Sequence, residues 1–222
     1  MRRSALLAIC LAADVLLVPA AFAVSAPSRI HGVIEEFDGQ YLSIKADSGT
    51  RIVIGVQPTT RIVHNHAMKL AELEAGDFVG TLALLGLDGK LRAQAVRVFP
   101  TPNLGTGEGQ YALESYPSRI VTNGRVALVT IAPSGATLAV TFHGATSDAN
   151  SGCSGRAPSG DWGCTGSVDL FIARGVPITA LSDGDTTLFL PGAIVSASAT
   201  SDAASLLTAS SITVERDAKL AR

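Results

Sequence analysis

The chain after residue 23 contains two copies of one strand pattern, and this repeat limits the possible folds more than any other feature. A sequence resemblance at a fixed spacing marks a repeated structural unit. Three pairs of segments carry the resemblance: 39–44 with 135–140 at an offset of 96, 73–79 with 189–195 at an offset of 116, and 91–98 with 207–214, also at 116. The change of offset predicts an insertion of 20 residues in the middle of the second copy.

The first 23 residues have the features of a secretory signal peptide. Arg2 and Arg3 form a positive start, residues 5–18 are mostly apolar, and Ala21-Phe22-Ala23 has small residues at the positions that a signal peptidase requires. Asp14 and Pro19 interrupt the apolar run, which is shorter than the roughly 20 residues of a membrane-spanning helix. We therefore expect cleavage after Ala23, a periplasmic or secreted protein, and no membrane insertion after cleavage.

The charge of the remaining chain argues against a nucleic-acid partner. The chain has 17 Lys and Arg and 19 Asp and Glu, and the signal peptide contains two of the Arg and one of the Asp. The mature chain is therefore mildly acidic and has mixed signs. A non-specific nucleic-acid groove needs a basic surface and stacking aromatic rings, and only 5% of the residues are aromatic. We expect no nucleic-acid partner.

Alternating apolar residues predict an all-β fold with one or two short helical turns. The first copy has expected strands at 30–37, 41–45, 51–56, 78–85 and 91–99, and a short helical stretch at 67–75 that ends at Gly76. Asp38-Gly39 and Ser48-Gly49 supply the hairpin turns. Three strands, a helical turn and two strands are the layout of an OB-like barrel of five antiparallel strands. The sequence predicts two such barrels in tandem.

The repeat also sets the expected domain boundaries. The segment 100–118 contains Pro100, Pro102, Pro117 and the run Gly105-Thr106-Gly107-Glu108-Gly109, without an apolar period. We interpret it as a linker rich in Pro and Gly. The expected organisation is a signal peptide at 1–23, a first barrel at 24–99, the linker at 100–118, and a second barrel at 119–222 that contains the cysteine insertion.

Several of these segments resemble a known family. The likeness lies in 73–80 (acidic, Gly, Asp, aromatic, Val, Gly), in 105–109, in 117–126 with Thr122-Asn123-Gly124-Arg125-Val126, and in Pro177-Ile178 through 190–193. The chain is similar to exported proteins of Gram-negative bacteria that carry tandem OB-like domains of unknown function. This resemblance implies a fold and a compartment outside the cytoplasm, and it implies no activity.

Two cysteines, Cys153 and Cys164, remain after signal cleavage. An even pair of cysteines in an exported chain predicts a disulfide, and the turn-rich residues between them allow the chain to double back. Trp162, Asp161 and Arg156 lie in this segment. Since aromatic and Arg side chains dominate binding surfaces, we expect these three to form a recognition surface, or Trp162 to cover the disulfide.

His64 and His66 are the candidate metal ligands. Residues two apart in an extended segment face the same side, so both imidazoles could bind one zinc or copper ion. A third ligand would come from Glu72, Glu74 or Asp77, or from His31 or His143 elsewhere in the fold. The alternative is a pair of solvated histidines at a strand end.

No catalytic residues are predicted, because the chain shows neither a nucleophile elbow nor a phosphate-binding loop followed by a helix. We expect a non-enzymatic surface-recognition module with an unknown protein or small-molecule partner and no cofactor. The alternatives are a periplasmic metal-binding module that uses zinc or copper, and an enzyme whose site lies between the barrels.

Overall fold

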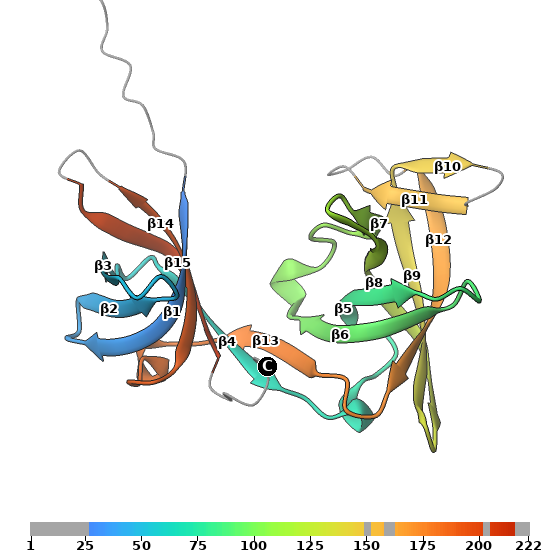
Figure 1. Ribbon diagram of the computed structural model, residues 1–222, viewed down its shortest axis with the longest axis horizontal. Helices are drawn as coiled ribbons and strands as arrows, with labels where there is room; N and C mark the ends of the chain where they lie inside the picture. The colour runs from blue at the N-terminus through green and yellow to red at the C-terminus, as the bar shows by residue number, and fades with distance from the viewer. Residues whose placement is uncertain (1–26, 149–151, 158–162, 202–204, 216–222) are drawn as a thin grey trace, which may run out of the picture.

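A computed structural model describes residues 27–148, 152–157, 163–201 and 205–215 of the chain (Figure 1). Regular structure in this part consists of fifteen strands and three single turns of 3-10 helix. The expected all-β class is therefore confirmed. The predicted signal peptide at 1–23 lies outside the described residues. No helix in the described ranges combines the length and the apolar character needed to cross a membrane.

The strands of the first copy agree with the expected segments, and one additional strand, β4, lies between the third and the fourth of them. The elements up to residue 99 are β1 (Ser28–Phe37), β2 (Tyr41–Ala46), β3 (Arg51–Gly55), β4 (Arg61–Ala67), η1 (Leu70–Glu72), β5 (Phe78–Leu85) and β6 (Leu91–Phe99). The helical stretch expected at 67–75 is only the turn η1, whose Lys69 N–H is capped by the Glu72 carboxylate at 2.6 Å.

The rest of the chain repeats this order with additions. Its elements are η2 (Thr101–Asn103), β7 (Gly109–Leu113), β8 (Tyr116–Ala132), β9 (Gly135–Gly144), β10 (Thr146–Asp148), β11 (Gly152–Arg156), β12 (Cys164–Ala173), β13 (Ile178–Asp183), η3 (Thr186–Leu188), β14 (Ile194–Ser201) and β15 (Leu207–Glu215). The segment 100–118, expected to be a linker, contributes β7, which pairs with β8 and β11.

Hydrogen bonds join all fifteen strands in one mixed sheet, and within it two sets of five strands close on themselves. Ring A follows the order β1-β2-β3-β15-β14 and returns to β1, with β3 and β15 parallel. Ring B follows β8-β9-β12-β6-β5 and returns to β8, with β12 and β6 parallel. Figure 1 shows the two rings at opposite ends of the molecule, with β4 and β13 between them.

Each ring combines strands from both copies, which differs from the expected arrangement of one barrel per copy. Ring A takes its first three strands from the first copy and β14 and β15 from the second, whereas ring B takes β8, β9 and β12 from the second copy and β5 and β6 from the first. The ranges 24–99 and 119–222 thus describe the repeats in the sequence, and not the sets of strands that pair in space. The physical reason is that similar strands can replace one another, as in domain swapping.

The two crossing strands, β4 and β13, carry the chain from one ring to the other. They pair antiparallel, with Asn65 opposite Leu181 at the centre. These two residues are 116 positions apart, which is the offset of the repeat, so they are equivalent positions of the two copies. Their pairing therefore lies on a pseudo-twofold axis that relates one copy to the other. The parallel pairs Val63–Thr213 and Thr179–Arg97 are related by the same offset. The register therefore agrees with the repeat found in the sequence.

Each ring encloses an apolar core, because alternate residues of every strand point inward. Corresponding positions of the two copies are buried in the two rings. The pairs are Ile34 and Val126, Leu42 and Leu138, Ile54 and Leu170, Val195 and Val79, and Ile212 and Val96, all at most 1% exposed. The turn η3 adds Leu188 to the core of ring A.

The first strand of each ring bends at the same position. The register of β1 shifts between Ile34 and Glu36, and that of β8 shifts between Val126 and Leu128. Gly32 and Gly124 precede these bulges. A Cβ added at Gly32 would lie 2.2 Å from the Lys45 carbonyl oxygen, and a Cβ added at Gly124 would lie 2.3 Å from the Thr141 carbonyl oxygen. Only glycine therefore permits this close approach of two strands.

Candidate functional site

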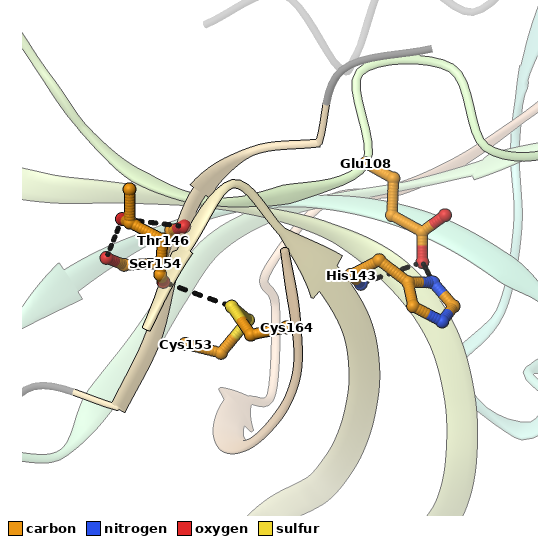
Figure 2. Close-up of a disulfide and its surroundings, with 6 residues drawn as sticks. All are labelled: Glu108, His143, Thr146, Cys153, Ser154 and Cys164. Atoms are coloured by element: carbon orange, nitrogen blue, oxygen red, sulfur yellow. Dashed lines mark hydrogen bonds and ion pairs between the residues drawn. A yellow bond between two sulfur atoms is a disulfide. The ribbon is translucent and has the colours of Figure 1, made fainter. Parts of the chain in front are cut away.

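The described part of the cysteine insertion forms an extension of ring B. Cys153 on β11 and Cys164 at the start of β12 form a disulfide with their Cα atoms 5.6 Å apart, as predicted (Figure 2). The disulfide packs closely against two glycines. A Cβ added at Gly144 would lie 2.7 Å from the Cys153 Sγ, and a Cβ added at Gly166 would lie 3.0 Å from the Cys153 Cβ. The described part of the insertion thus contributes β11, which pairs antiparallel with β10, is linked to β12 by the disulfide and pairs with β7.

Of the three predicted recognition residues, Trp162 and Asp161 lie outside the described residues. Arg156 ends β11, and its Nη2 donates to the Tyr111 hydroxyl at 3.0 Å while the guanidinium carbon lies 4.8 Å from the centre of the Tyr111 ring. Arg156, Tyr111 and the β7–β8 turn line a pocket of about 490 Å³. The sequence did not indicate this partner, because Tyr111 belongs to the segment expected to be a linker.

The glycine-rich run is held by a pair of side chains that the sequence analysis did not connect. The Glu108 carboxylate, 12% exposed, lies 2.8 Å from His143 Nδ1 and accepts a hydrogen bond from the His143 backbone N–H at 3.0 Å (Figure 2). This contact fixes the loop to β9. A carboxylate at this place would repel a phosphate group.

His64 and His66 lie on the crossing strand β4, and their ring centres are 5.0 Å apart. No cluster of three His, Cys, Asp or Glu side chains that could hold a metal ion occurs within the described ranges. Two of the expected third ligands have other partners: His31 lies 2.7 Å from Asp47, and His143 lies beside Glu108. The structure thus brings the two imidazoles together without a third ligand from the described residues.

A groove on the outside of ring B combines residues from both copies. It is lined by Asp88, Gly89, Lys90 and Arg92 at the β5–β6 turn, by Thr137 on β9, and by Ser167, Val168, Asp169 and Phe171 on β12, and its volume is about 700 Å³. The turn reaches the β9–β12 surface because β6 pairs parallel with β12. The sequence contains no signal for this site, since its two walls come from different repeats.

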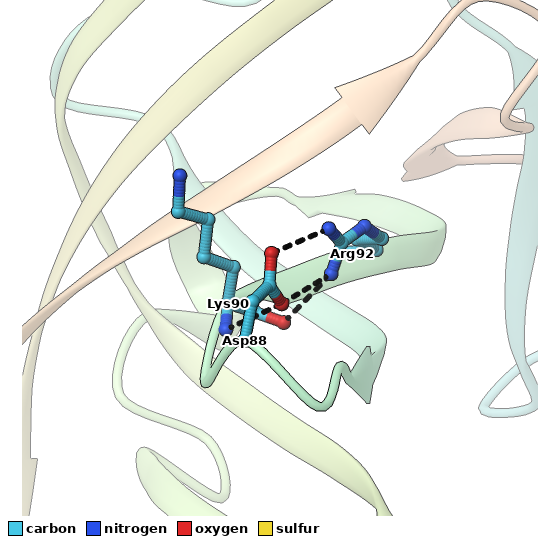
Figure 3. A network of polar contacts seen from close by, with 3 residues as sticks. All are labelled: Asp88, Lys90 and Arg92. Atoms are coloured by element: carbon cyan, nitrogen blue, oxygen red, sulfur yellow. Dashed lines mark hydrogen bonds and ion pairs between the residues drawn. The ribbon is translucent and has the colours of Figure 1, made fainter.

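One wall of the groove is fixed by an ion pair. Arg92 donates from Nη1 to Asp88 Oδ1 at 2.8 Å and from Nη2 to Asp88 Oδ2 at 2.7 Å (Figure 3). The hydrogen bonds from the Arg92 guanidinium and from the Lys90 backbone N–H hold the pKa of the Asp88 carboxyl well below its ordinary value. The Lys90 side chain extends away from this pair (Figure 3). The turn is therefore ordered by its own side chains, and it presents an ammonium group that forms no ion pair with the described residues.

No family model, no curated protein and no solved structure matches the chain.

Proposed function

We propose that the protein is an exported, non-enzymatic binding module built on two OB-like barrels, and that the ring B groove binds a hydroxyl-rich ligand, an oligosaccharide segment. The pairing order of each ring, with the first three strands consecutive and the third parallel to the last, is the order of an OB-like barrel. In that architecture the face of the second and third strands binds oligonucleotides or oligosaccharides. The groove lies on the corresponding strands, β9 and β12.

The observation that carries the proposal is the balance of charges in this groove. Its lining contains two carboxylates, Asp88 and Asp169, and two cations, Lys90 and Arg92. A groove without net charge does not attract a polyanion, because affinity for a nucleic-acid backbone depends on a basic surface. Closely spaced donors and acceptors suit a neutral ligand with many hydroxyl groups.

The remaining lining fits the same class of ligand. Thr137 and Ser167 provide hydroxyl groups that both donate and accept, and Phe171 provides an apolar ring surface. Binding sites typically combine such an apolar surface with a few polar groups that orient the ligand. The argument from the architecture is an analogy of fold, whereas the argument from charge and side-chain chemistry rests on this chain.

Export supports a ligand outside the cytoplasm. The N-terminal signal pattern and the Cys153–Cys164 disulfide are both typical of proteins in oxidising compartments. Arg156 on β11 and Tyr111 on β7 then form a second surface on the strands attached to ring B, where an additional part of the ligand or a protein partner would be recognised.

A glycan array with the mature protein, followed by calorimetry on the best ligand, tests the proposal. We expect Asp169→Asn combined with Phe171→Ala to weaken binding at least tenfold, and Lys90→Ala to weaken it less. Lys45→Ala is the matched control, since Lys45 is an exposed lysine on β2 of the other ring. The proposal fails if no glycan binds, or if the groove variants bind as well as the control.

A zinc or copper module is the second candidate, and the 5.0 Å separation of the His64 and His66 rings favours it. A metal that binds the folded protein raises its melting temperature. We expect such a rise to disappear in His64→Ala combined with His66→Ala. The absence of any rise with either metal at well above micromolar concentration would refute this candidate.

A further inference from the structure

A third cavity lies between the rings, and it is separate from the groove and from the pocket beside Arg156. Its volume is about 410 Å³. Ring B supplies an apolar wall that includes Leu82, Phe99 and Val121. The opposite side is formed by the crossing strands and by the end of β15, the last strand of ring A. Figure 1 shows β4 and β13 between the two rings at this place.

The register places four polar residues of this cavity on one face of the crossing sheet. Arg97 on β6 is opposite Thr179 on β13, and Asn65 on β4 is opposite Glu215 on β15. Asn65 is also opposite Leu181, which lies two residues after Thr179 and so on the same side of β13. Directly paired residues and residues two apart in a strand share a face. The four side chains therefore project into the same space.

Asn65 is buried there with an unused acceptor. Its side chain is 4% exposed, its Nδ2 donates to Glu215 Oε1 at 2.8 Å, and its Oδ1 has no hydrogen-bond partner within the described part of the chain. The orientation of the amide is fixed chemically, because a carboxylate accepts only from the NH₂ group. A buried polar atom without a partner costs about 1–3 kcal/mol, so a ligand that donates to this oxygen would recover stability.

Arg97 offers the complementary charge at the rim of the cavity. Its Nε lies 3.5 Å from the Thr179 hydroxyl oxygen, and no carboxylate of the described ranges forms an ion pair with it. The terminal nitrogens of a guanidinium bind a carboxylate in a planar, bidentate manner. One end of the cavity therefore suits an anion, and the end with Glu215 and the Asn65 oxygen suits a cationic donor.

We infer that this cavity binds an apolar α-amino acid as the zwitterion. The ligand carboxylate lies against Arg97, its ammonium group donates to Asn65 Oδ1 and to the Glu215 carboxylate, and its side chain packs against the ring B wall. The bound amino acid would then connect β15 of ring A to β6 of ring B. It binds without any covalent step, and it does not depend on the function proposed for the groove.

Calorimetry on the mature protein with L-leucine and L-phenylalanine tests the inference. N-acetyl-leucine, which lacks the ammonium group, and leucinamide, which lacks the carboxylate, are the matched ligands. We expect both amino acids to bind and each matched ligand to bind at least about tenfold more weakly, as the loss of one charge-assisted contact implies.

Two protein variants decide whether the binding occurs in this cavity. We expect Arg97→Gln and Glu215→Gln each to weaken leucine binding about tenfold or more, whereas Arg119→Gln, an exposed arginine stacked on Tyr116, leaves it unchanged. Circular dichroism melts verify that each variant is folded. The inference is overturned if neither amino acid binds, if the matched ligands bind equally well, or if the folded Arg97 and Glu215 variants bind like the control. Groove variants such as Asp169→Asn leave this binding intact, so the two proposals fail independently.

Discussion

Replacing Ile212 by alanine tests whether the two copies exchange their C-terminal strands. Ile212 lies on β15 in the second copy, is 0% exposed, and packs in the ring A core with residues of β1, β2 and β3 from the first copy. The substitution removes three carbon atoms. At ~0.8 kcal/mol for each buried methylene the transfer loss is about 2.4 kcal/mol. A residual cavity brings the total loss of stability to roughly 3–4 kcal/mol.

The position of the effect is more informative than its size. If the backbone amides of a ring exchange their hydrogens through opening of that ring, a decrease of about 3 kcal/mol in the free energy of opening accelerates this exchange about 100-fold. We expect this acceleration in β1, β2 and β3, which belong to the other copy. We expect little change in β8, β9 and β12, which belong to the same copy as Ile212.

The matched variant is Val96→Ala, because Val96 occupies the corresponding position in ring B and is 1% exposed. Its effect should be the mirror image: faster exchange in β8, β9 and β12, and little change in β1–β3. Hydrogen exchange followed by mass spectrometry of peptides measures both. The reasoning is refuted if Ile212→Ala accelerates exchange in β8, β9 and β12 while β1–β3 keep their protection.

Three further predictions concern single sites. Gly32→Ala should lower the unfolding free energy by about 1–3 kcal/mol through overpacking against a carbonyl oxygen, whereas Gly55→Ala, which meets only ordinary contacts at 3.6 Å, should change it far less in the same denaturant titration. Reducing the disulfide, which links residues 11 apart, should cost roughly 2–3 kcal/mol in a thermal melt, and a ring A that also lost its protection would contradict this. The Asp88 carboxyl should titrate below its ordinary pKa of 3.8. The stabilisation from its contact with Arg92 is therefore present above that pH and lost as the pH falls through the lowered pKa. Arg92→Gln should return the NMR titration of Asp88 towards 3.8, and an unchanged titration would disprove this cause.

The positions of most strands could be predicted because they depend on local signals. Alternating apolar residues and turns such as Asp38-Gly39 specify a strand and its inward face wherever that strand later pairs. The strand β4 was not predicted, because His64, Asn65 and His66 are polar and only the pairing with β13 and β15 buries Asn65. A strand whose central residues are polar has no apolar period to detect.

The exchange of strands could not be predicted for a different reason. Ile212 and Val96 are both β-branched, both point inward, and lie at equivalent positions of the two copies. Either β6 or β15 could close either ring, so the sequence pattern that reveals the repeat does not show which ring each strand joins. The choice depends on where the short segment after β3 directs the chain, which is a property of the whole fold.

The candidate sites follow from that choice. The groove joins Lys90 from the first copy to Asp169 from the second, and the cavity between the rings joins Arg97 to Glu215. Residues this far apart in the sequence meet only if the strands are exchanged. The disulfide, in contrast, was predicted correctly because Cys153 and Cys164 are close in the sequence and depend little on the topology.

Disulfide cross-linking is the most direct measurement of the exchange on which both sites depend. Arg29 on β1 is paired with Ser198 on β14, and paired antiparallel residues lie within the Cα separation that a disulfide bridges. If each copy closed its own ring, Leu82 on β5 would occupy the place of Ser198. We predict that Arg29→Cys with Ser198→Cys gives an intrachain cross-linked peptide by mass spectrometry, and that Arg29→Cys with Leu82→Cys gives none. A cross-link in the second variant, together with free thiols in the first, would contradict the exchange.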